Sequence, residues 1–179
     1  MALDLSKIQE GDIGFTSTNR IIGMIIKACT KSKVEHVFQF IKPFHGSRLL
    51  YRCEMVQDVT TKQDIKITNP LKEREIVSVK RPLYAYRSDN DRLTFKQRMI
   101  NWHETATISY DTAELFSHLP WLGDKKDHNK RNMICSRLVY KNLCLDSGNK
   151  LKSHTFDETV TPSDLYSWDG LYEVPGAVV

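Results

Sequence analysis

Cys135 and His36 are the residues of this sequence whose types and surroundings best suit nucleophilic chemistry. Cys135 opens an apolar pattern of helical period, so we expect its thiol in the first turn of a helix that Gly148 ends. The positive end of a helix dipole favours the thiolate, which is the nucleophilic form of cysteine. Position alone leaves a second interpretation, in which Cys135 is a small buried core residue.

His36 lies in an apolar and aromatic segment, Val34 to Ile41, that has the composition of a β-strand. A second strand is expected from Arg48 to Val59, and the two would form an antiparallel hairpin. A hairpin centred on His45 places Glu54 directly across from His36. A carboxylate there would hold the imidazole in one tautomer and stabilise its cation, as in a triad of nucleophile, base and acid.

The register of this hairpin leaves alternatives open. A shift of one or two positions brings Arg52 or Val56 opposite His36. Glu35 points to the opposite face of its strand and is a weaker orienting residue, whereas Gln57 is a neutral substitute. His36 itself could be a packed strand residue, because it shares a face with two phenylalanines.

Length and composition indicate one soluble globular domain spanning residues 1–179. The chain has 179 residues, of which 40% are hydrophobic and 27% are charged. The N-terminus lacks the features of a secretion signal, so we expect a cytoplasmic protein, with virion association or delivery by a phage or virus left open. The apolar run Ile21 to Ile26 is too short to span a bilayer, so no transmembrane segment is expected.

The cysteine pattern predicts reduced thiols, because there is neither a secretion signal nor the dense spacing of a disulfide scaffold. The sequence contains no CxxC or HxxxH pair, so we expect no metal site and no cofactor. The four cysteines are Cys29, Cys53, Cys135 and Cys144.

The net charge is mild and requires no polyanionic partner, since 26 basic and 22 acidic residues give +4. One basic cluster, Lys125 to Arg131, precedes Cys135 in an expected loop. It has no interleaved stacking aromatics, so a solvated loop is favoured over a nucleic-acid site. Its cations would nevertheless lower the pKa of a nearby thiol. The oligomeric state cannot be deduced from these patterns.

The remaining patterns predict a sheet and further helices around these residues. Helices are expected from about Arg20 to Thr30 and from Asp91 to Thr107. A loop-rich region at 109–131 includes a helical turn at Thr112 to His118. Strands are expected within 10–15, 65–67, 76–79 and 171–174, and a capping box at Thr161 to Asp164.

Six fragments, taken in their order along the chain, resemble the circularly permuted NlpC-type papain-like cysteine hydrolases, in the branch of bacterial YiiX-like proteins and their poxvirus relatives. The resemblance spans nearly the whole chain. The fragments are Gly11-Asp12-Ile13, Glu35-His36-Val37, Cys53-Glu54-Met55, Tyr110-Asp111, Ile134-Cys135-Ser136-Arg137-Leu138-Val139 and Thr161-Pro162-Ser163-Asp164-Leu165.

This resemblance implies an α+β fold, papain-like in permuted order, with an antiparallel sheet packed against the helix that carries Cys135. It implies Cys135 as nucleophile, His36 as base and Glu54 as the acid that orients His36. The substrate would be a peptide, amide or acyl ester (including thioesters) cleaved through an acyl-enzyme. The backbone N–H of Cys135 would contribute to oxyanion stabilisation.

Two related activities fit this sequence less well. The lipid acyltransferases of this superfamily carry their cysteine in an Asn-Cys-Glu-His context that is absent here. A murein-cleaving enzyme is usually exported, and we expect no signal. The main alternative is a catalytically inactive binding or virion structural module on the same fold.

Overall fold

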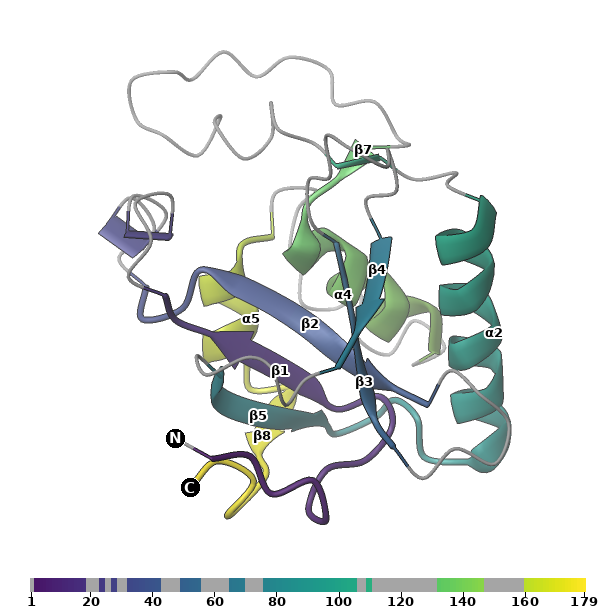
Figure 1. The fold of residues 1–179 in the computed structure, drawn as a ribbon, viewed down its shortest axis with the longest axis horizontal. Helices are drawn as coiled ribbons and strands as arrows, with labels where there is room; N and C mark the ends of the chain where they lie inside the picture. Colours follow the sequence, from purple (N-terminus) through teal and green to yellow (C-terminus); the bar gives the residue numbers. More distant parts are fainter. Residues whose placement is uncertain are drawn as a thin grey trace.

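The computed structural model describes residues 2–18, 23–24, 27–28, 32–42, 49–55, 65–69, 76–105, 109–110, 132–146 and 160–179. These residues form an α+β fold built on a six-stranded antiparallel sheet in the order β4-β3-β2-β1-β5-β8 (Figure 1). The strands are β1 (Ile13–Thr16), β2 (His36–Ile41), β3 (Tyr51–Met55), β4 (Ile65–Thr68), β5 (Ile76–Pro82) and β8 (Leu171–Glu173). The helices are α2 (Asp89–Thr105), α4 (Cys135–Asp146) and α5 (Pro162–Ser167), and β6 (Ser109–Tyr110) pairs with β7 (Asn132–Met133) in parallel.

All three helices cover the same face of the sheet (Figure 1). Alternate residues of the strands supply that face, since a strand directs successive side chains to opposite sides. Val37 and Ile41 of β2 belong to the core that includes Leu138 of α4, Phe95 of α2 and Leu165 of α5. The apolar period of the Cys135 helix is therefore what holds it against the sheet.

The opposite face of the sheet is covered by the two ends of the described chain. Phe38 and Phe40 of β2 pack there with Ile8, Val174 and Ala177. The termini lie side by side, and the backbone N–H of Ala2 donates to the carbonyl of Val179 at 2.7 Å (Figure 1). Both faces of β2 are thus buried, which fixes the backbone around His36. No helix within the described ranges is long and apolar enough to cross a bilayer.

The register predicted for the β2–β3 hairpin is wrong by two positions. Gln39 pairs with Cys53, and Ile41 pairs with Tyr51. The direction and size of the shift match the alternative that paired His36 with Val56, although Val56 itself lies outside the described residues. A shift by two leaves every side chain on its original face, so the hydrophobic pattern could not distinguish the two registers.

Helix α2 begins at Asp89, two residues before the predicted start. Ser88 and Asp91 explain this, because the backbone N–H of each donates to the side chain of the other at 3.0 and 3.1 Å. Such a reciprocal cap satisfies N–H groups of the first turn. The predicted capping box at Thr161 is confirmed at the start of α5.

Some predictions fall on parts of the chain outside the described residues. Of the helix expected at 20–30, residues 23–24 and 27–28 are described and helical. The turn at 112–118, the basic cluster at 125–131, and Gln57 and Gly148 lie outside.

Candidate active site

Cys135 is the first residue of α4, as the sequence predicts, and its side chain is buried at the junction of helix and sheet. The first turn is anchored on both sides. The backbone N–H of Leu138 donates to the carbonyl of Ile134 at 3.1 Å, and the hydroxyl of Ser136 donates to the carbonyl of Val160 at 2.6 Å. The thiol is therefore held on a fixed backbone.

His36 lies between Cys135 and Glu54. Its Nε2 atom is 2.6 Å from Oε2 of Glu54, and its ring also forms a hydrogen bond with the thiol of Cys135. The structure thus brings together the three residues proposed from the sequence, in the order thiol, imidazole, carboxylate.

The contact between His36 and Glu54 forms in spite of the shifted register. The ladder between β2 and β3 ends at the pair Gln39 and Cys53, so Glu54 would stand level with Phe38. His36 reaches Glu54 diagonally, over the distance that separates residues two positions apart on neighbouring strands. The predicted neighbourhood is confirmed, although directly opposed pairing is not its cause.

Arg52 holds the Glu54 carboxylate from its other side. Its Nη2 atom is 2.5 Å from the same Oε2 atom, and both side chains are almost fully buried. The guanidinium lies over the ring of Phe38, 4.5 Å from the centroid, and Thr68 donates its hydroxyl to Oε1 at 3.4 Å. The sequence patterns suggest Arg52 only as an alternative partner of His36 in the hairpin and do not predict this contact with Glu54.

These contacts shift the pKa of Glu54 and of His36 in opposite directions. Burial raises the pKa of Glu54, but His36 and Arg52 outweigh it and lower the pKa to about 2. Burial lowers the pKa of His36, but Cys135 and Glu54 outweigh it and raise the pKa above its usual value. Glu54 is therefore a carboxylate and His36 a cation at neutral pH.

The pKa of the Cys135 thiol is lowered. Burial alone would raise it, but the charge and the hydrogen bond of His36 lower it, as do the backbone N–H groups of Val37 and Ser136. Each of these groups stabilises the thiolate rather than the thiol. Together these groups favour the pair of thiolate and imidazolium over the neutral pair.

Val37 belongs to the candidate site through its backbone N–H, which side-chain patterns in the sequence do not predict. The N–H of Phe40 donates to Asp12 just before β1, at 2.9 Å. Successive N–H groups of a strand point to opposite neighbours, so the N–H of Val37 points toward β3. The ladder to β3 has ended there, which leaves this N–H for the sulfur of Cys135.

Glu35 does not take the orienting position. Its Oε1 atom accepts a hydrogen bond from the backbone N–H of Thr18 at 2.8 Å and a longer one from the hydroxyl of Thr16 at 3.4 Å. Its side chain is directed at the end of β1, where these two threonines lie. Burial raises its pKa.

Comparisons with known proteins identify a fold. No family model matches the sequence, and no curated protein matches it. Among solved structures, the chain is similar to the metalloprotein YiiX from Escherichia coli O157:H7, with a TM-score of 0.62 and 17% identity over 94% of this chain and 97% of that chain. At this identity the likeness shows the fold alone, so the chain has a YiiX-like α+β fold.

Because YiiX is a metalloprotein, we asked whether the present residues could hold a metal. Within the described part of the chain, no three His, Cys, Asp or Glu side chains are placed to hold an ion. Cys135, His36 and Glu54 form a chain with the imidazole in the middle, and Nε2 is already engaged by Glu54. Such a chain does not provide a common centre for ligands, so these residues do not fit a metal site.

Proposed function

We propose that residues 1–179 form one domain of the permuted NlpC-type papain-like class and act as a cysteine hydrolase. Cys135 is the nucleophile, His36 the base and acid, and Glu54 the group that orients His36. One observation carries this proposal: the continuous contact of thiol, imidazole and buried carboxylate at the first turn of a helix. The YiiX-like fold supports this proposal, because the sequence fragments resemble the YiiX-like branch of that class.

The reaction begins with attack of the Cys135 thiolate on the carbonyl carbon of an amide, ester or thioester. A carbon–sulfur bond forms, and the carbonyl electron pair moves to oxygen, where the backbone N–H of Cys135 stabilises it. The His36 imidazolium donates its proton to the leaving nitrogen, oxygen or sulfur as that bond breaks. The acyl group then remains on Cys135 as a thioester.

Water completes the cycle. Neutral His36 takes a proton from the attacking water, and the resulting hydroxide oxygen bonds to the acyl carbon. The tetrahedral intermediate collapses by releasing the Cys135 thiolate, which restores the starting pair of ions. Glu54 holds His36 in the tautomer that both proton transfers require.

A second candidate is a binding or virion structural module that has kept the fold without turnover. One observation favours it: Cys135 is only 4% exposed, so a substrate reaches the sulfur only if neighbouring groups move. The two candidates differ in whether an acyl group is ever transferred to the thiol.

Trapping the acyl-enzyme tests the proposal. We expect p-nitrophenyl esters, or members of a mixed peptide and ester library, to add an acyl mass that peptide mapping assigns to Cys135. The Cys135→Ala variant is the control and should gain no such mass. Rapid alkylation of Cys135 without any acyl adduct from the whole library would favour the binding module.

A further inference from the structure

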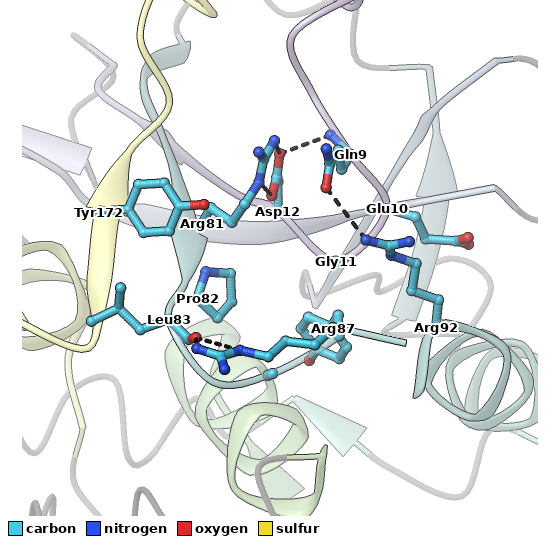
Figure 2. A pocket seen from close by; sticks show the side chains of 12 residues that line it. Gln9, Glu10, Gly11, Asp12, Arg81, Pro82, Leu83, Arg87, Arg92 and Tyr172 are labelled. Atoms are coloured by element: carbon cyan, nitrogen blue, oxygen red, sulfur yellow. Dashed lines mark hydrogen bonds and ion pairs between the residues drawn. The ribbon is translucent and has the colours of Figure 1, made fainter. Parts of the chain in front are cut away.

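A cavity lies at the end of the sheet opposite to Cys135. His36 pairs with Thr16 at one end of β1, and the other end, at Ile13, pairs with Lys80 of β5. Beyond that second end is a cavity of about 490 Å³ (Figure 2). Its walls come from the turn before β1, the end of β5 with the segment that follows it, the first turn of α2, and β8. It is therefore separate from the candidate active site.

Three arginines line this cavity, and one of them is neutralised. Nε and Nη2 of Arg81 each donate to a different oxygen of Asp12 at 2.8 Å, and Nη2 also donates to the carbonyl of Lys7 at 3.0 Å. Asp12 is buried, and Figure 2 shows the two side chains directed at each other. This bidentate ion pair is therefore a structural part of the cavity wall.

The guanidinium of Arg87 is held by a neutral group, the backbone carbonyl of Leu83. Its Nε donates to the carbonyl of Leu83 at 2.8 Å, and its Nη2 donates to the same oxygen. The guanidinium also lies 5.3 Å from the centroid of the Tyr84 ring. A carbonyl and an aromatic face orient a cation without cancelling its charge.

Arg92 is weakly engaged. Its Nη2 is 3.4 Å from Oε1 of Gln9 (Figure 2). Its Nη1 is 3.3 Å from the carboxylate of Asp89, whose side chain is fully exposed. Its Nε is buried and has no hydrogen-bond partner among the described residues. An ion pair with a solvated carboxylate contributes little, so Arg92 has capacity for a stronger acceptor.

Arg92 also stands where this cavity meets another. An adjoining hollow of about 380 Å³ shares Gln9, Glu10 and Arg92 with the first, and adds Lys42 and Lys96 to the wall. In the first cavity, three arginines face two carboxylates; the second adds two lysines and one aspartate. The joined walls therefore carry two more positive than negative charges.

We infer that this hollow binds a small molecule carrying a phosphate group, with Arg87 and Arg92 as its charged contacts. Arg87 and Arg92 line the same cavity, and each guanidinium can donate to a phosphate group, which accepts hydrogen bonds in several directions. The neutral pair of Arg81 and Asp12 contributes rigidity to the wall rather than charge. The site does not depend on the chemistry proposed for Cys135.

Titration of the isotope-labelled full chain tests this inference by NMR, with inorganic phosphate, glucose 6-phosphate and AMP at constant ionic strength. We expect saturable shifts at the arginine side chains and at the backbone of Gly11, and about tenfold weaker binding in Arg87→Gln or Arg92→Gln. Lys141→Gln removes one charge from α4, outside the cavity, and should bind as the unmodified chain does. Arg92→Lys retains the charge and serves if Arg92→Gln does not fold.

The three ligands separate the sources of phosphate. Tighter binding of either ester than of inorganic phosphate would assign a phosphorylated metabolite, and equal binding would assign free phosphate; both support the site. Absence of saturable shifts with all three ligands overturns the inference. Equal weakening by Lys141→Gln and Arg92→Gln overturns it too, because the attraction would then be general.

Discussion

Two buried cysteines, Cys53 and Cys135, have pKa values that are shifted in opposite directions. They are 1% and 4% exposed, so burial does not distinguish them. Burial and the charge of Glu54 raise the pKa of Cys53, whereas the pKa of Cys135 is lowered. Two cysteines that are buried to a similar degree therefore differ in pKa, because the thiol is favoured at Cys53 and the thiolate at Cys135.

His36 accounts for the difference. Glu54 acts on Cys53 directly, as a negative charge that disfavours a second one. It acts on Cys135 through His36, whose cation it stabilises and whose charge in turn favours the thiolate. A carboxylate thus deactivates one thiol and activates another, depending on whether an imidazole lies between them.

Replacing each cysteine with alanine gives the largest expected contrast. Cys135→Ala should abolish acyl transfer from p-nitrophenyl esters, a loss on the order of 10⁴-fold or more for a nucleophile. Cys53→Ala should transfer acyl groups at close to the original rate. Stopped-flow release of nitrophenol measures both variants. Comparable losses in the two would show that the cysteines are not functionally distinct.

Glu54→Gln should remove the group that distinguishes the two thiols. We expect slower alkylation of Cys135 at pH 6, because a neutral amide stabilises the His36 cation less than a carboxylate does. The change also leaves Arg52 buried without its carboxylate, which costs about 3–5 kcal/mol of unfolding free energy. Urea denaturation measures this cost, and an unchanged midpoint would contradict the buried ion pair.

Acid should weaken the fold through the same residue. The pKa of Glu54 lies at about 2 in the folded chain, below the ordinary value of 4.5. A lowered carboxyl pKa stabilises the fold above the ordinary value and ceases to do so as the pH falls toward 2. About 3 kcal/mol should be lost in this window. The Glu54→Gln variant should not lose this part of the unfolding free energy, because it has no carboxyl group to protonate. Denaturation curves of the two chains between pH 5 and 2 measure the difference.

Alkylation of Cys53 is the smallest expected effect. Its raised pKa and its burial leave almost no thiolate, so iodoacetamide should not label it in the folded chain at pH 7. Cys53→Ala should change the labelling rate of Cys135 by less than about twofold while costing about 1–2 kcal/mol of stability. If peptide maps showed that Cys53 is labelled before Cys135, the expected order of reactivity of the two thiols would be wrong.

Local patterns predicted the elements that carry the site. The helical period after Cys135 identified α4, because that helix buries one continuous face. The apolar composition around His36 identified β2, because that strand is buried on both faces. The neighbourhood of His36 and Glu54 followed from hairpin geometry even with a shifted register, since a shift by two keeps both side chains on one face.

Other features of the site depend on where pairing stops and on contacts between distant segments. The backbone N–H of Val37 is available because the ladder between β2 and β3 ends, and no side-chain pattern records that. Arg52 holds Glu54 within the same strand, a role invisible without knowing which face is buried. The order of the sheet, with β1 between β2 and β5, likewise results from pairing of segments far apart in sequence.

The pH dependence of Cys135 alkylation in the unmodified chain and in His36→Ala tests the central claim most directly. If His36 maintains the thiolate, the iodoacetamide rate at Cys135 should be nearly constant from pH 6 to 8. In His36→Ala it should be slower at pH 6 and rise about tenfold per pH unit, as for an ordinary thiol. A tenfold rise per unit in the unmodified chain, or identical profiles in the two chains, would contradict the account.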